Sequence, residues 1–224
     1  TLKTGKFMMR LNIKNSRFKS SALLTFLSLL LVSSWAFAYN GPAQDPRNKA
    51  SYTPTTPTDP AYIIQTTLQK ITTFSSNSDK VNPVQLRGFI ENEIIPHFDF
   101  DNMSHWITGR YARNMSAKDK SDFQRNLRET FLSSLSKHLG SFDAKNTTVK
   151  FLKTRYRGRD ESFVGTNIYR PDTLPVRLDF RMRRDGDDWK IIDVKANGSS
   201  AVLYYRRHFI AELREFDRQS RRLY

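Results

Sequence analysis

The stretch Pro175–Gly198 constrains the fold more than any other part of the chain. Apolar residues occupy every second position from Val176 to Met182, with arginines and an aspartate between them. That alternation predicts a strand that is buried on one face only. Asp185-Gly186 and a second β-rich run, Trp189–Val194, follow directly, and this order predicts an antiparallel hairpin. Other elements must then cover its broad apolar face.

Four helices are predicted before this hairpin, because apolar residues recur there at helical spacing behind capping residues. The second helix should stop near Ile95, because Pro96 follows. Side chains that typically cap a helix start stand at Asp59, Asn82, Asp99 and Ser116.

The apolar period changes to two after the fourth helix. Thr148–Tyr156 and Ser162–Tyr169 alternate apolar and polar residues and are predicted strands. Asn197-Gly198 ends the last strand, and a final helix begins at Ser199 or Ser200. This order of elements predicts an α+β fold, in which an antiparallel sheet of about four strands is covered on one face by several helices.

The first 38 residues have the layout of a secretory signal peptide. Six basic residues precede the uncharged apolar run Ala22–Val32, and small residues stand at Ala36 and Ala38. This layout predicts cleavage after Ala38. The apolar run is also shorter than the roughly 20 residues that span a bilayer. Residues 39–59 are then a flexible lead-in, and residues 60–224 form a single domain.

The chain has a formal net charge of +15, which falls to +9 without the six basic residues of the leader. An export signal argues against nucleic acid as the partner. An anionic membrane surface or an acidic protein fits the positive charge better. Because the sequence contains no cysteine, an exported protein of this kind must hold together by its core alone.

No catalytic or metal-ligating residues are predicted. The chain lacks cysteine and a Gly-x-Ser-x-Gly motif, and its four histidines show no metal-ligand spacing. Asp185, Asp187 and Asp188 are not followed by the glutamate that closes a calcium-binding loop. The sequence therefore predicts a protein that is not an enzyme and uses no cofactor.

The polar face of the hairpin carries Arg177, Arg181 and Arg183. One interpretation is a solvated outer face, on which arginines are balanced by Asp179. The other is a docking site for an acidic partner or for anionic headgroups. Both interpretations stay open at the level of sequence.

Five segments occur in a recognisable order: Ile94–Met103, Gly109–Tyr111, Phe123–Leu135, Val176–Phe180 and Trp189–Val194. Together they resemble the MlaC family of periplasmic phospholipid-binding proteins, also called the toluene-tolerance family. The resemblance spans roughly Leu86–Leu213. Asn197 departs from the family pattern, which commonly has glutamate there. The sequence also ends in Arg-Arg-Leu-Tyr, where the family tends to continue into another apolar helical segment.

The resemblance implies that helices and a curved sheet enclose an apolar pocket for acyl chains. It implies that phospholipid is the cargo and that no cofactor takes part. The partners would be an outer-membrane lipoprotein complex and an inner-membrane transporter complex, and transport across the periplasm would maintain outer-membrane lipid asymmetry. The candidate pocket lining is Met103, Ile107, Tyr111, Phe131, Leu135, Leu178, Phe180, Ile192, Val194, Val202 and Tyr205.

Two other functions stay open. A non-lipid adaptor of the cell envelope would have a closed core. An enzyme with an enclosed pocket would need a polar pair inside it, such as Asp193 with Tyr205.

Overall fold

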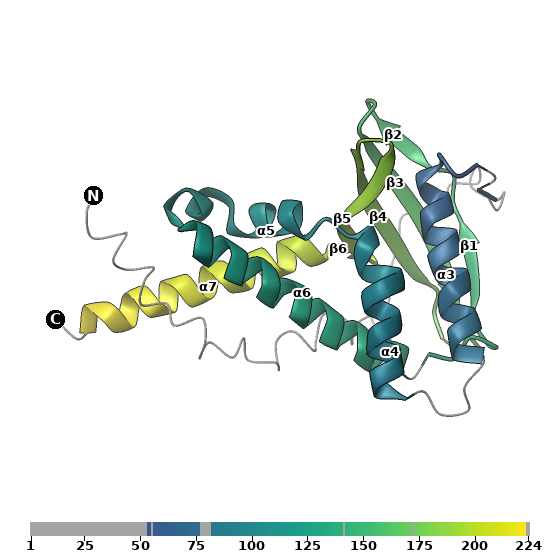
Figure 1. Ribbon diagram of the computed structural model, residues 1–224, viewed down its shortest axis with the longest axis horizontal. Coiled ribbons are helices and arrows are strands. Elements are labelled where there is room, and N and C mark those ends of the chain that lie inside the picture. Colours follow the sequence, from purple (N-terminus) through teal and green to yellow (C-terminus); the bar gives the residue numbers. More distant parts are fainter. Residues whose placement is uncertain (1–52, 55, 77–81, 141, 172, 223–224) are drawn as a thin grey trace.

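The computed structural model describes residues 53–54, 56–76, 82–140, 142–171 and 173–222. The predicted signal peptide lies outside these residues, as does most of the predicted lead-in. Helices flank the strands in the predicted order (Figure 1). They are α3 (Pro60–Ser76), α4 (Pro83–Phe89), the π-helical turn η2 (Ile90–Ile94), the 3-10 turn η3 (Ile95–His97), α5 (Phe100–Thr108), the 3-10 segment η4 (Gly109–Asn114), α6 (Ala117–Leu139) and α7 (Ala201–Arg222).

Hydrogen bonds confirm the predicted helix starts. The Asp99 carboxylate accepts from the backbone N–H of Asn102 at 2.9 Å, at the start of α5. The Asn82 side chain accepts in the same way in the first turn of α4. Ser116 and Asp119 form a capping box at the start of α6. The polar residues ahead of each apolar stripe therefore set where these helices begin.

The helix predicted to stop near Ile95 continues slightly further. After α4 the chain turns through η2 and η3 and leaves the helical path after His97. Pro96 is tolerated because it stands in the first turn of the 3-10 helix, where its missing N–H costs no hydrogen bond.

The α+β fold is confirmed, with six strands where about four were predicted. All neighbouring strands are antiparallel, in the order β1-β3-β4-β5-β6, and β2 also pairs with β3. The strands are β1 (Thr148–Phe151), β2 (Arg155–Arg157), β3 (Glu161–Tyr169), β4 (Val176–Asp185), β5 (Asp188–Ala196) and β6 (Ser199–Ser200).

The predicted strand over residues 148–156 is divided into β1 and β2. Phe151 lies opposite Thr166, whereas Arg155 lies opposite Phe163, so one extra residue stands between the two pairings. Phe151 and its neighbour Leu152 are both buried. Strict alternation therefore breaks at this point, as in a β-bulge.

The predicted hairpin is confirmed as β4 and β5. Phe180 lies opposite Val194, but Met182 lies opposite Ile191, so Ile192 is an extra residue on β5. This second bulge explains how the adjacent isoleucines of β5 can both be buried within one strand.

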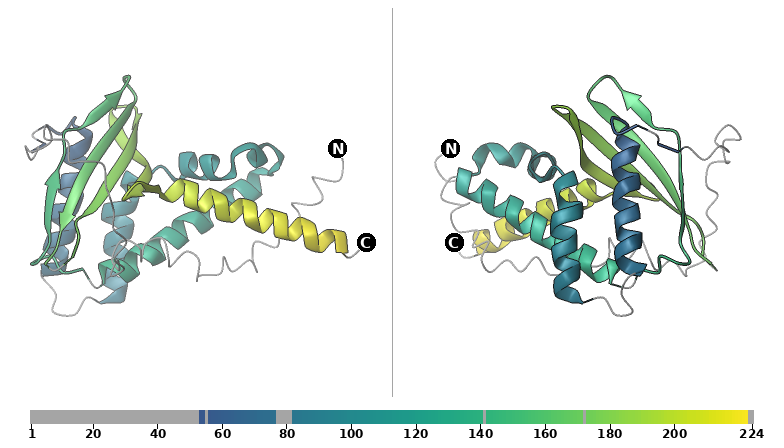
Figure 2. Two further views of the ribbon diagram at one scale, coloured as in Figure 1. Left: turned by 180° about the vertical axis from the view of Figure 1, so that it is seen from behind. Right: turned by 45° about the vertical axis from the view of Figure 1, so that its right-hand side comes forward.

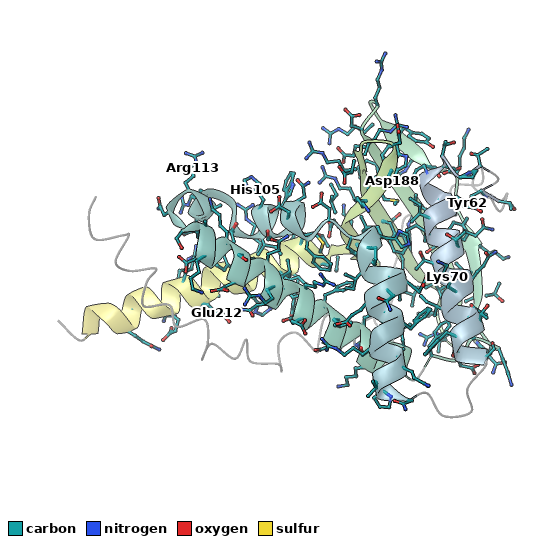
Figure 3. All side chains as sticks on the ribbon, viewed as in Figure 1. Tyr62, Lys70, His105, Arg113, Asp188 and Glu212 are labelled. Carbon is teal, nitrogen blue, oxygen red and sulfur yellow. The ribbon has the colours of Figure 1, made fainter. Side chains whose placement is uncertain are left out.

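Two apolar clusters form the core. The sheet cluster joins α3 to the inner face of the sheet, which is the face toward α3, and contains Ala61, Ile64, Phe151, Val164, Met182, Trp189 and Ile191. The helical cluster joins the remaining helices and includes Leu86, Ile90, Met103, Ile107, Leu132, Val202, Tyr205 and Phe209. Helix α3 lies along the sheet, whereas α6 and α7 extend away from it (Figure 1, Figure 2). Lys70, labelled in Figure 3, lies on α3, and its side chain forms an ion pair with Glu93 of η2.

A tight turn joins β5 to β6 and leads into α7. Asn197 and Gly198 both have positive φ, 46° and 85°, and asparagine and glycine adopt this conformation at low cost. The Asn197 side chain also accepts from the Arg177 N–H at 2.9 Å. Because β6 follows the turn, α7 begins at Ala201, one residue after the latest predicted start.

Candidate functional site

Seven of the predicted pocket residues lie together among the helices. Met103 and Ile107 of α5 are 2% and 1% exposed, so they belong to the close-packed interior. Phe131 and Leu135 of α6 are only half-buried, and part of their apolar surface is therefore open to another molecule. The full set in or against the helical cluster is Met103, Ile107, Tyr111, Phe131, Leu135, Val202 and Tyr205.

The other four predicted pocket residues lie on the sheet. Phe180 and Val194 are opposite each other on the inner face and pack against the sheet cluster, yet both stay half-buried. Leu178 shares this face and is also half-buried. Ile192 is buried at the bulge. Three apolar side chains of the inner face therefore keep exposed surface.

Phe98 connects the two clusters. Its side chain packs against both of them, and its ring centre is 4.6 Å from that of Phe131. The backbone there is held to the sheet, because the Asp99 N–H donates to the Ile191 carbonyl at 2.9 Å. Phe98 therefore lies where the α6 side and the sheet side of the apolar core come together.

An open cleft of about 820 Å³ lies between the start of α5, helix α6 and the β4–β5 hairpin. Phe98 is part of its wall, but most of the lining is charged or polar. Such a wall offers hydrogen-bond partners to a polar group and little cover for acyl chains. The charged residues of the lining are Glu91, Asp99, Asp101, Arg125, Arg128, Arg183, Arg184, Asp185 and Lys190.

The three arginines predicted to bind a partner have different surroundings. Arg177 forms an ion pair with Asp179 at 2.9 Å. Arg181 forms an ion pair with Glu161 of β3. Arg183 lines the cleft and has no carboxylate within ion-pair distance among the described residues. The positive charges of Arg177 and Arg181 are therefore balanced by carboxylates of the sheet. The interpretation as a solvated face had named Asp179 as such a carboxylate.

Asp193 caps α7. Its carboxylate, 7% exposed, accepts from Ser200 Oγ at 2.7 Å and from the Val202 N–H at 3.1 Å. These bonds satisfy donors at the start of the helix that have no partner within it. Asp193 and Tyr205 both lie in the described part of the chain, and no hydrogen bond joins them.

Burial raises the pKa of Tyr205 to about 12, and the neighbouring Tyr204 acts in the same direction. The neutral phenol therefore stabilises the fold fully below pH 10.0, the ordinary pKa, and this contribution is lost as the pH rises through 12. We expect the free energy of unfolding to fall by about 1 kcal/mol more in the unchanged protein than in Tyr205→Phe when the pH rises from neutral to about 11. Urea denaturation at each pH measures this. Parallel pH profiles for the two proteins would contradict it.

The described residues contain no group of three or more histidine, aspartate or glutamate side chains placed to hold a metal ion. Within the same part of the chain, none of the helices has the length and apolar character needed to cross a bilayer.

Sequence reasoning assigned no contact to Phe98, Trp106 or Arg206. Arg206 of α7 donates to the Trp106 carbonyl at 3.1 Å and so holds the end of α5. A Cβ at Gly109, which has a φ of 53°, would stand 3.1 Å from Arg206 Nη2. Gly109, which directly follows α5, was the only feature of the local sequence that indicated this close approach.

Comparisons with a protein-family model and with solved structures both give matches. A family model described as MlaC protein matches residues 63–220. Among solved structures, the chain is similar to a phospholipid-binding protein from Ralstonia solanacearum in complex with a phospholipid, with a TM-score of 0.61 and 17% identity over 68% of this chain and 86% of that one. A search of curated proteins finds no match. The structural likeness is one of fold, and it agrees with the α+β architecture.

Proposed function

Because the chain belongs to the MlaC protein family, we propose that it binds and carries phospholipid, as a transport protein rather than an enzyme. A fold shared with a phospholipid-binding protein supports this proposal. The proposed route runs through the periplasm, between an outer-membrane lipoprotein complex and an inner-membrane transporter complex, and maintains outer-membrane lipid asymmetry. Support for the route comes from the sequence resemblance and from the leader that predicts export.

Carriage of a phospholipid through water requires cover for its acyl chains. Each methylene group kept from water contributes about 0.8 kcal/mol, so a lipid with roughly 30 methylenes costs on the order of 20 kcal/mol to expose. A carrier must therefore surround nearly all of both chains.

The observation that carries the proposal is the half-buried apolar surface on the two sides of Phe98. We name it the acyl surface and define it as Phe131 and Leu135 of α6 with Leu178, Phe180 and Val194 of the inner sheet face. We infer that these side chains form one groove, because contiguous exposed apolar surface marks binding sites. We assign the acyl chains to it, whereas the fully buried side chains of α5 hold the helical cluster together.

Protein purified as the cell produces it should contain roughly stoichiometric phospholipid. Native mass spectrometry measures the bound mass, and lipid extraction identifies the species. Delipidated protein should melt at a higher temperature once phospholipid is returned, because a ligand that binds only the folded state stabilises it. If the protein is lipid-free and added phospholipid does not change its Tm, the proposal is wrong, and the adaptor with a closed core is favoured.

A further inference from the structure

The outer face of the sheet, which points away from α3, carries basic and aromatic side chains in cross-strand rows. In one row Arg155 of β2 lies opposite Phe163 of β3, which lies opposite Arg181 of β4. Figure 2 (left) shows the strands in front of α3, with this face toward the viewer. We name it the outer basic face and define it as Lys150, Arg155, Arg157, Phe163, Tyr169, Arg177, Arg181 and Arg183, with Trp106 of α5 at its edge.

Aromatic rings on the outer basic face stand beside cations. The pairs are Arg155 with Phe163, Lys150 with Tyr169 and Arg181 with Trp106, at 5.9, 5.3 and 5.1 Å from cation to ring centre. Trp106 is 44% exposed and Tyr169 36% exposed. Because each cation is attracted to its ring, the face presents apolar and positive groups side by side to solvent.

Three carboxylates on this face are already engaged, whereas Asp185 and Asp188 at the end of the hairpin form no ion pair among the described residues. Glu161 pairs with Arg181, Asp179 pairs with Arg177, and Asp193 caps α7. Several cations keep no such partner: among the described residues, no ion pair involves Lys150, Arg155, Arg157 or Arg183. The outer basic face therefore has uncompensated positive charge.

We propose that the outer basic face docks onto an anionic lipid bilayer. Arginine pairs well with phosphate groups, and basic residues near an anionic membrane are attracted to it. Exposed tryptophan and tyrosine rings favour the headgroup level of a bilayer, where one side of the ring is apolar and the other wet. The choice of a bilayer over other polyanions rests on the proposed function, since the cargo comes from a membrane. Docking through this face leaves Leu178, Phe180 and Val194 of the acyl surface, which lie on the opposite face of the sheet, free.

Vesicle co-sedimentation tests the proposal with protein purified as the cell produces it. R155E/R157E reverses two cations on β2, a strand whose residues are all exposed. We expect this variant to bind phosphatidylglycerol-containing vesicles at least about tenfold more weakly, since each basic residue near such a surface contributes about fivefold. The matched control, K120E/K137E, makes the same change of charge on exposed positions of α6 outside the cleft and should bind like the unchanged chain.

Trp106 provides a second measurement. Vesicles with nitroxide-labelled headgroups should quench its fluorescence, and Trp106→Phe should remove most of the quenching. Cleavage after Ala38 would remove Trp35, and Trp189 is 4% exposed and packs in the sheet cluster. Equal vesicle binding by R155E/R157E and its control, or quenching that survives Trp106→Phe, would overturn the proposal. Tighter binding of an oligonucleotide or of polyglutamate than of the vesicles, lost in R155E/R157E, would also overturn it and give the face another partner.

The same samples separate this proposal from the proposed function. Native mass spectrometry should find phospholipid in R155E/R157E at the level of the unchanged chain, because none of the acyl surface is altered. If R155E/R157E retains its phospholipid and still binds vesicles as the unchanged chain does, only the docking proposal is refuted. A chain that docks but contains no phospholipid refutes the proposed function alone.

Discussion

Leu135→Arg should reduce phospholipid affinity by at least about a hundredfold while the protein stays folded, because a charge placed against acyl chains loses its hydration without gaining a partner. Leu135 is half-buried on α6, so the long arginine side chain can reach solvent in the empty protein. A bound acyl chain would close that path. Titration with a fluorescent phospholipid measures the affinity, and native mass spectrometry measures the cargo that copurifies.

Val84→Arg is the matched control for this change. Val84 is 79% exposed on α4, so the same substitution there adds the same charge away from the acyl surface. Its cargo and Tm should equal those of the unchanged protein. Full cargo in a folded Leu135→Arg variant would show that α6 does not line the lipid site.

Asp193→Ala should lower the free energy of unfolding by about 3 kcal/mol, a factor of more than 100 in the ratio of folded to unfolded protein. The buried carboxylate accepts two hydrogen bonds, and its removal leaves Ser200 Oγ and the Val202 N–H without this partner. Asp193→Asn keeps one side-chain oxygen as acceptor and should cost about half as much. Urea denaturation measures the free energy of unfolding of the unchanged protein and of the two variants.

Asn82→Ala provides the comparison with an exposed cap. The Asn82 side chain accepts from the Val84 N–H at the exposed start of α4, so its loss should cost about 1 kcal/mol. If Asp193→Ala costs no more than Asn82→Ala, then the apolar contacts of α7 within the helical cluster hold this helix without help from the cap.

Helix starts and strand alternation could be predicted because they depend on residues a few positions apart. The Asp99 cap and the alternation of β4 are examples. The two bulges could not be predicted in this way. Ile192 becomes the extra residue only because Met182 pairs with Ile191. The sequence of one strand does not determine the register in which it pairs with its neighbour.

The candidate site could be predicted as a set of apolar residues but not as a surface. Met103 and Leu135 both belong to apolar helix stripes, yet one is 2% exposed and the other half-buried. That difference depends on which segments pack nearby, and helical spacing does not contain this information. The ion pairs also depend on contacts that one strand's sequence does not contain, since Arg181 is paired with Glu161 of another strand and not with Asp179.

Phe98 also has a consequence for the range of cargo. Its backbone neighbour is bonded to β5 and its ring lies on Phe131 of α6, so Phe98 is a point at which the sheet cluster and the helical cluster meet. A change in the packing of this one ring would alter the space between the clusters and keep the contacts inside each of them. We therefore expect the interior to adjust to tails of different length and unsaturation, so that one protein can serve the mixed lipid population of a living membrane.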